Sequence, residues 1–240
     1  MTSWNLASLS SSEKRELLSL LEERERRKSR RKLFALYPDS GPLRRDLYAK
    51  HIEFFAGGKQ HRERCMMAAN RVGKTWGVGG YETALHLTGR YPDWWEGRRF
   101  ETPVEWWAAG DTAETTRDIV QAALMGPIGA MGTGLIPGDD IIGEPSKRAG
   151  ITGAMDTARV RHVTGGVSIL GFKSYDQGRR KFQGTAKHGI WLDEEPPMDV
   201  YTECLTRTMT LDGLVLCTFT PLEGATDVAL MFLDEEKKAA

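Results

Sequence analysis

The stretch that decides the fold is MAANRVGKTWGVGG, residues 67–80. The apolar run RCMMAA, which predicts a short buried strand, leads into it, and residues with helical spacing follow to about Leu87. Gly73, Lys74 and Thr75 lie between that strand and that helix. In this order the exposed backbone N–H groups and the N-terminus of the helix point at one spot, where they bind phosphate. The sequence therefore predicts a phosphate-binding loop.

The residue types in this loop suit nucleotide binding. Gly73 lets the backbone approach closely, Lys74 places a cation against the β and γ phosphates, and Thr75 offers a hydroxyl to Mg²⁺. Ala68 stands where such loops usually begin with glycine, and alanine fits there if its φ stays negative. We expect ATP to contact the whole loop, which consists of Ala69, Asn70, Arg71, Val72, Gly73, Lys74 and Thr75.

A second set of candidate residues follows the apolar run GIWL, residues 189–192. Asp193 comes directly after it, where a nucleotide site needs a carboxylate that holds Mg²⁺ through water at the end of a buried strand. Glu194 is next, and we expect it to polarise the attacking water. The alternative is that these acids only cap the helix that follows. The two motifs together favour a site that hydrolyses ATP.

A third element is LVLCTFTP, residues 214–221. As a strand it would bring the hydroxyl of Thr218 or Thr220 near the γ-phosphate, where such a residue can report hydrolysis to a moving segment. The alternative is that the Thr-Pro pair merely ends the strand.

The remaining chain alternates between strands and helices. Continuous apolar strands that alternate with helices predict an α/β fold with a mostly parallel sheet covered on both faces. Asp111 and Glu114 are expected to cap the helix that runs to about Met125, and Gly165-Gly166 is expected to turn a hairpin. The other expected elements are a helix over residues 43–55, a strand over 104–110, a long loop over 126–153 and a helix over 199–208.

The N-terminal segment is expected to form a separate arm. Ser10 and Glu13 form a possible capping box, and leucines at helical spacing follow, so a helix to about Lys32 is predicted. Its second half is almost wholly charged, which favours an arm that extends from the body. We therefore divide the chain into an arm, residues 1–36, and an ATPase domain, residues 37–240.

Charge is unevenly distributed, although the formal net charge is zero. Residues 24–32 read RERRKSRRK, and residues 144–188 hold nine Lys or Arg against three acidic residues. Such polarity can place a polyanion on one face; the alternative is a solvated surface. The sequence has no secretory signal and no apolar run near the ~18 residues that span a bilayer. The three cysteines lack the spacing of a metal site or disulfide framework, so we expect a cytosolic protein with buried thiols.

The ordered set of motifs resembles one known family. AANRVGKT, WWAAGDTAETTRDIV, TGGVSILGF, RRKFQGTAKHGIWLDEEP and LCTFTP together resemble the ATPase domain of the large terminase subunit of tailed double-stranded-DNA bacteriophages. The resemblance covers roughly residues 37–221. It implies a P-loop ATPase fold of the ASCE type that uses ATP and Mg²⁺ to pump double-stranded DNA into a procapsid. It also implies a pentameric ring in the host cytoplasm, docked on the portal protein and partnered by the small terminase subunit.

The resemblance also implies roles for particular residues. Lys74 and Thr75 match the phosphate and Mg²⁺ positions, Asp193 and Glu194 match the metal and base positions, and Thr218 to Thr220 match the coupling motif. Arg71 matches an arginine that senses the γ-phosphate within its own subunit. Ring motors also place an arginine in the neighbouring subunit's site. Arg179 or Arg180 is favoured for this trans role, Arg159 and Arg161 compete, and contact with phosphate backbone or plain surface charge is the alternative.

The adenine base is expected to bind upstream of the loop. Terminases place an apolar slot and a polar reader there, and DLYAKHIEFFAGG offers Tyr48 and His51, with Phe54 and Phe55 beside them. The glutamine usual in this segment is missing, and His51 is the candidate to take its place. The alternative is that these aromatic residues are core.

One departure from the family pattern concerns the nuclease. Large terminases carry a C-terminal nuclease domain, whereas about twenty residues follow Pro221 here. We therefore expect an isolated ATPase domain that hydrolyses weakly, exists as a monomer on its own and does not cut DNA. Two other functions compete: a helicase-like or RecA-like ATPase, and a docking module with a nucleotide fold but no hydrolysis. The Asp193–Glu194 pair argues against the last.

Overall fold

The computed structural model describes residues 10–222, 224 and 226–239. Its centre is a seven-stranded sheet in the order β1-β7-β6-β2-β5-β4-β3. The first five strands in that order are parallel, and β4 and β3 are antiparallel to their neighbours. The expected α/β fold with a mostly parallel sheet is therefore confirmed. The strands are β1 Glu63–Met67, β2 Glu105–Gly110, β3 Ser146–Lys147, β4 Met155–Arg161, β5 Val167–Ser174, β6 Gly189–Asp193 and β7 Leu214–Phe219.

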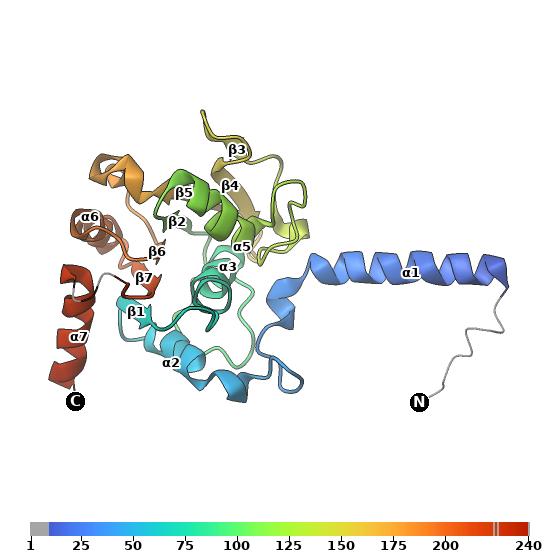
Figure 1. The fold of residues 1–240 in the computed structure, drawn as a ribbon, viewed down its shortest axis with the longest axis horizontal. Coiled ribbons are helices and arrows are strands. Elements are labelled where there is room, and N and C mark those ends of the chain that lie inside the picture. Colours follow the sequence, from blue (N-terminus) through green and yellow to red (C-terminus); the bar gives the residue numbers. More distant parts are fainter. Residues whose placement is uncertain (1–9, 223, 225, 240) are drawn as a thin grey trace.

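Helices connect the strands and surround the sheet (Figure 1). The α-helices are α1 Ser11–Ser29, α2 Ala49–Gly57, α3 Tyr81–Thr88, α4 Ala113–Thr115, α5 Ala122–Met125, α6 Met198–Met209 and α7 Asp227–Ala239. Two wider π-helical segments are η4 Lys74–Gly80 and η5 Thr116–Gln121. Short 3₁₀ turns are η2 Lys32–Ala35, η3 Arg45–Tyr48, η6 Gly138–Asp140, η7 Tyr175–Gln177 and η8 Arg179–Phe182. None of the helices in the described ranges is long and apolar enough to span a bilayer.

The sheet has a hydrophobic core on each face. Successive side chains of a strand point to opposite faces, and β2 shows this directly: Trp106 packs in the core under α3, and Trp107 packs in the core that contains α6. Strand β6 alternates in the same way, with Trp191 in the first core and Leu192 in the second. Burial on both faces explains why these strands read as continuous apolar runs.

The phosphate loop joins β1 to a continuous helical segment made of η4 and α3. The segment ends at Gly89, whose φ of 70° closes the last turn. A side chain at Gly79 would lie 2.0 Å from the Trp191 indole nitrogen, so only glycine lets η4 pack this closely on β6. The predicted order of strand, loop and helix is thus confirmed.

Helix α1 extends away from the body, as Figure 1 shows. The capping box at its start is confirmed, since Ser10 N donates to Glu13 Oε2 at 2.7 Å and Glu13 N donates to Ser10 Oγ at 3.3 Å. The base of the arm contacts the loop after α5, where the Gly138 N–H donates to the Arg30 carbonyl at 3.3 Å. Leu33, just beyond α1, is buried in the core.

Two local predictions differ from the structure. Asp111 and Glu114 do not cap the helix after β2: Thr112 does, in a reciprocal pair of hydrogen bonds with Thr115. The Asp111 carbonyl instead accepts a hydrogen bond from the Asp176 N–H at 3.1 Å. Helix α7 spans residues for which no element was predicted. The region 126–153, expected to be a long loop, also contains η6 and the short strand β3, whereas the hairpin of β4 and β5 is as expected.

Candidate nucleotide site

The phosphate loop has the backbone shape that its sequence predicts. Gly73 has a φ of 89° and Arg71 a φ of 66°, while Ala68 is not among the described residues with positive φ. Alanine therefore fits at the first position of the loop without strain. The Ala68 N–H donates to the Phe219 carbonyl at 3.3 Å, which fixes the start of the loop against the end of β7.

Lys74 is held at the centre of the loop by three hydrogen bonds. Its Nζ donates to the carbonyls of Ala68 and Ala69 and to Thr220 Oγ1, each at 2.8 Å. The side chain is only 7% exposed. An ammonium has three protons, and these three acceptors use them all. Lys74 thus ties the loop to Thr220, directly after β7, and the coupling role of Thr220 stays a prediction.

Asp193 lies at the end of β6 and faces the loop. Its carboxylate accepts hydrogen bonds from Thr75 Oγ1 at 3.0 Å and from Thr218 Oγ1 at 2.7 Å. Thr218 in turn accepts a bond from Trp191 Nε1 at 2.7 Å, which fixes its rotamer. Burial raises the pKa of Asp193 to about 7, against the lowering effect of the two threonine hydroxyls. The structure therefore brings three motifs, at residues 75, 193 and 218, into direct contact.

Glu194 has a constrained backbone beside this carboxylate. Its φ is 63°, a left-handed conformation that is costly for glutamate. The Glu194 N–H donates to the Thr218 carbonyl at 3.0 Å, and Tyr175 Oη donates to the Asp193 and Glu194 carbonyls at 3.0 and 3.1 Å. Partial burial raises the pKa of the Glu194 carboxyl, and Lys74 opposes this. Its side chain is exposed, next to a pocket of about 620 Å³ that Asp111 and Thr220 also line.

The oxygen atoms at this site suit Mg²⁺. The Thr75 hydroxyl and the Asp193 carboxylate are hard donors, 3.0 Å apart. Mg²⁺ prefers such donors, keeps several waters and binds through one or two protein groups plus substrate phosphates. Among the residues that the structure describes, no cluster of three or more His, Cys, Asp or Glu forms an all-protein metal cage. The residues therefore fit a cation that arrives with a nucleotide.

The structure does not support the adenine role predicted for His51. Its side chain is only 6% exposed, and its Nδ1 lies 2.7 Å from the hydroxyl of Tyr37. Tyr37 donates that hydroxyl proton to the Gly77 carbonyl at 2.6 Å. Burial lowers the pKa of His51, and a hydrogen bond with the Val72 backbone opposes this. His51 therefore contacts the phosphate loop from its buried side, and its burial leaves little of the ring open to a base.

The neighbouring aromatic residues are mostly core, which was the alternative to a base platform. Phe54 and Phe55 are buried. Tyr48 is half-buried, with its ring 5.6 Å from Tyr37 and 5.4 Å from His51. Contact of Tyr48 with adenine stays a prediction.

The candidate arginines are not gathered at one point. Arg179 Nε donates to Glu203 Oε2 on α6 at 2.8 Å, so its guanidinium is paired within its own chain. Arg180 is exposed beside it, and Arg71 is exposed on the phosphate loop. Arg159 and Arg161 are exposed on β4. The sensor role of Arg71 and the choice of trans arginine stay predictions.

Two tyrosines that position the site were not predicted from the sequence. Tyr37 reaches Gly77 across 40 residues, and Tyr175 reaches Asp193 across 18. Neither lies in a recognisable motif. Both contacts depend on the order of the strands, which local patterns do not give.

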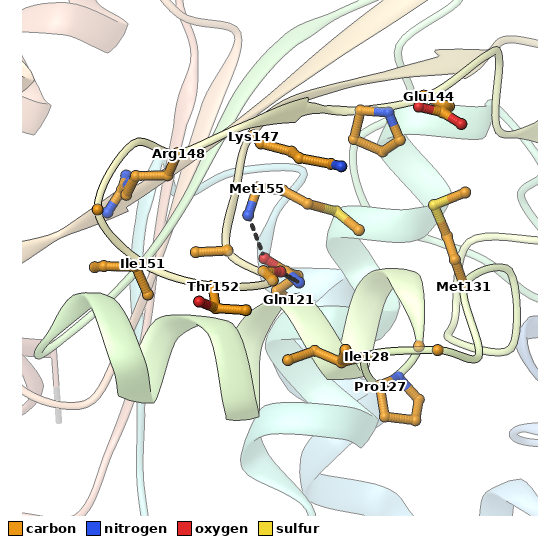
Figure 2. Close-up of a pocket in the computed structure, with 16 residues that line it drawn as sticks. Gln121, Pro127, Ile128, Met131, Glu144, Lys147, Arg148, Ile151, Thr152 and Met155 are labelled. Atoms are coloured by element: carbon orange, nitrogen blue, oxygen red, sulfur yellow. Dashed lines mark hydrogen bonds between the residues drawn. The ribbon is translucent and has the colours of Figure 1, made fainter.

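A further pocket lies away from these residues (Figure 2). It has a volume of about 920 Å³ and opens between residues 126–131 and 144–155. Gln121 joins its lining, since its side-chain amide donates to the Gly153 carbonyl at 2.9 Å and accepts from the Met155 N–H at 2.7 Å. None of the predicted site residues lines this pocket.

Comparison with known proteins settles the family. A family model described as "Terminase large subunit, T4likevirus-type, N-terminal" matches residues 65–240. The chain belongs to the terminase large subunit family. The large terminase subunit of Salmonella phage P22 is 39% identical to it over 254 residues, covering 98% of this chain and 49% of that protein. The chain thus spans about half the length of this relative.

Solved terminase structures confirm the fold. The large terminase of a thermophilic bacteriophage superposes with a TM-score of 0.54 at 14% sequence identity, covering 79% of this chain and 42% of that one. A second structure of the same thermophilic phage protein, in complex with ADP, gives the same values. This chain of the terminase family therefore has the P-loop ATPase fold of the ASCE type, as expected.

Proposed function

We propose that this chain is the ATP-hydrolysing motor domain of a phage DNA-packaging terminase. The observation that carries the proposal is the array of Lys74, Thr75, Asp193 and Glu194. The hydrogen bonds of Lys74 and Thr75 join the phosphate loop to the ends of β6 and β7. The ADP complex of the thermophilic phage terminase supports nucleotide binding in this fold.

The residues of the array divide the chemistry. The loop N–H groups and the Lys74 ammonium bind the phosphates, for which Lys74 exchanges protein acceptors for phosphate oxygens. Thr75 and Asp193 would hold Mg²⁺, which when bound neutralises charge on the phosphates. The exposed Glu194 carboxylate accepts a hydrogen bond from the attacking water and orients it. Lys74 donates to both Thr220 and the loop, so a movement of Lys74 towards phosphate would break its bond to Thr220 and change the contacts at the end of β7.

The whole machine requires further partners. We propose that the domain works in a homo-oligomeric ring on the portal protein in the host cytoplasm, with the small terminase subunit, and moves double-stranded DNA. A trans arginine completes the site in the ring. Arg180 is the stronger candidate of the favoured pair, because Arg179 is already paired with Glu203. An isolated chain therefore lacks part of its site and hydrolyses slowly.

The test is ATP hydrolysis as a function of protein concentration. We expect the rate to rise more steeply than the concentration and to vanish in Lys74→Ala. Lys59→Ala, which changes an exposed lysine elsewhere, should hydrolyse like the wild type. Mixing Arg180→Ala with Glu194→Ala should restore activity that neither has alone. If the wild type neither binds nor hydrolyses ATP, the motor proposal fails and a docking module replaces it.

A further inference from the structure

Strand β4 carries arginines on one face only. Ala158 and Val160 point into the core, while Arg159 and Arg161 are exposed on the opposite face. Their register partners on β5 are Ile169 and Val167. Directly paired residues of neighbouring strands share a face. The arginines and the half-exposed apolar residues of β5 therefore form one surface.

The same surface continues across β5 to β2. Lys173 on β5 pairs with Ala109, and Gly171 pairs with Trp107. Because Gly171 has no side chain, the Trp107 indole lies over it, and a Cβ there would be 2.8 Å from the ring. The ammonium groups of Lys173 and Lys187 lie 5.1 and 5.0 Å from the centre of the Trp107 ring. These cation–π contacts fix both lysines against the ring, with Lys173 half-exposed and Lys187 buried.

The cations on this surface outnumber the acids. Burial lowers the pKa of Lys173; Asp156 opposes this, and the nearby charges of Arg148, Lys181 and Lys187 lower it further. Lys187 pairs with Glu105, and Arg148 lies 4.0 Å from Asp156. Lys187 and Arg148 are thus paired and largely buried. We call the four remaining cations, Arg159, Arg161, Lys173 and Lys181, the basic sheet face. Clustered like charges are unfavourable unless a polyanion neutralises them.

Helices cover a different part of this side of the sheet. The core on this side consists of residues from β2, β6, β7, α6 and α7, with Tyr175 of η7 and Phe182 of η8, and no buried residue of β4 belongs to it. In Figure 1, α6 and α7 lie at one end of the sheet, and β4 and β3 lie at the other. The exposed arginines of β4 thus lie beyond the helical layer, open to a partner.

We propose that the basic sheet face binds the phosphate backbone of duplex DNA. The choice of DNA as the polyanion rests on the proposed motor function. Trp107 is only 6% exposed under its two lysines, so the surface offers cations and not an aromatic platform for unstacked bases. This favours a duplex, which is bound through its phosphates, over a single strand, which stacks on aromatic rings.

The location of this surface gives it a route to the nucleotide site. Lys173 precedes Tyr175 by two residues, and Tyr175 donates to the Glu194 carbonyl at 3.1 Å. Strand β5, which carries Lys173, therefore leads directly into Tyr175, whose hydroxyl holds the backbone of Glu194. A duplex bound to the basic sheet face would contact β5 directly, through Lys173.

The test is binding of a fluorescent duplex of arbitrary sequence, measured by anisotropy over a series of salt concentrations. The variant is Arg159→Gln/Arg161→Gln/Lys173→Gln. The control, Arg44→Gln/Lys50→Gln/Lys59→Gln, removes the same charge from exposed residues near α2. Both keep the basic arm, so its contribution cancels. We expect the first variant to bind about tenfold more weakly at low salt, and the log–log salt slope to fall by about 2 to 3. The control should change neither the slope nor the affinity beyond about twofold.

The outcomes separate this inference from the motor proposal. Equal losses in the two triple variants, or no duplex binding by the wild type, would overturn the basic sheet face even if ATP hydrolysis is intact. Selective loss in the first variant supports it even if the chain hydrolyses no ATP. Thermal melting of both variants within a few degrees of the wild type would show that the fold is retained.

Discussion

Tyr37 donates its hydroxyl proton to the carbonyl of Gly77 at 2.6 Å, and the same hydroxyl lies 2.7 Å from His51 Nδ1. Gly77 lies in η4, just after Lys74 and Thr75, and a side chain there would lie 2.8 Å from the Tyr37 hydroxyl. The tyrosine is fixed among aromatic rings that include Phe55 and Tyr81. The phosphate loop is therefore supported by a rigid pair of side chains from outside its own motif.

Removing this support should weaken nucleotide binding. Tyr37→Phe keeps the ring and loses the hydrogen bond, which is worth about 1 kcal/mol, so we expect ADP to bind roughly fivefold more weakly. Tyr91→Phe is a matched control, because Tyr91 Oη lies 2.8 Å from His86 Nδ1 in a similar buried pair away from the loop. Calorimetric titration of ADP decides the matter. Equal affinities for the two variants would contradict the role of Tyr37.

Tyr175 gives a second prediction, on turnover. Its hydroxyl holds the carbonyls of Asp193 and Glu194. In Tyr175→Phe we expect kcat to fall about five- to tenfold, the loss of one hydrogen bond, while the KM for ATP stays within twofold. Tyr201→Phe loses a comparable bond, to Glu63 at 2.7 Å, and should keep its kcat. Steady-state kinetics of both variants test this. A rise in KM with unchanged kcat would show that Tyr175 serves nucleotide binding instead.

A third prediction concerns the free energy of unfolding, to which a buried ion pair near the phosphate loop contributes. Arg64 Nη2 donates to Glu82 Oε1 at 2.6 Å, and both side chains are buried. We expect Arg64→Leu to lower the free energy of unfolding by about 3–5 kcal/mol, because it strands the Glu82 carboxylate. The half-exposed pair of Arg98 and Asp212 offers a comparison, and Arg98→Gln should cost about 1 kcal/mol or less. Urea unfolding measures both. A loss below 1 kcal/mol in Arg64→Leu would contradict the account.

Acid should weaken the region of this ion pair through His86. Burial lowers the pKa of His86, with Glu82 opposing this. The unfolded chain binds a proton at His86 below about pH 6.5, whereas the folded chain stays neutral to lower pH. This contribution to stability is therefore complete above pH 6.5 and is lost as the pH falls below it, at up to about 1.4 kcal/mol per pH unit. His51, His162 and His188, whose pKa values burial also lowers, act in the same direction.

The measurement is the free energy of unfolding in urea at pH 7.5 and 5.5. Between these pH values the raised pKa of Asp193 acts in the opposite direction, so the test is the difference between two proteins. We expect the wild type to lose stability relative to His86→Gln as the pH falls, because the variant lacks the fully buried imidazole. Equal changes in the two proteins would show that His86 does not titrate in this way.

The order of the elements along the chain could be predicted from the sequence, but most of their contacts in space could not. Periodicity and the glycine turn identified β1, the loop and its helix, because these depend on neighbours along the chain. The meeting of Thr75 with Asp193 followed from a rule about parallel strands, whose carboxyl ends share one edge. The supports from Tyr37 and Tyr175 could not be predicted, because they depend on which strands are adjacent and on side-chain packing.

Two misreadings have the same physical origin. His51 has the polarity of a base reader, but the fold buries it against Tyr37, and nothing in its local sequence indicates that burial. Asp111 is a good cap by residue type, yet Thr112 and Thr115 make the reciprocal bonds because the helix begins one residue later. In both cases several residue types satisfy the local pattern, and the tertiary position of the backbone selects among them.

Hydrolysis by a Glu194 variant tests the central claim most directly. Glu194→Gln keeps the size of the side chain and removes the carboxylate, so we expect ATP binding within about threefold of the wild type and a rate of hydrolysis at least about 100-fold lower. Glu195→Gln, one residue away, should hydrolyse like the wild type. Steady-state hydrolysis beside equilibrium ATP binding, for all three proteins, gives the answer. Undiminished hydrolysis by Glu194→Gln would contradict the assignment of the catalytic base and with it the proposed hydrolytic site.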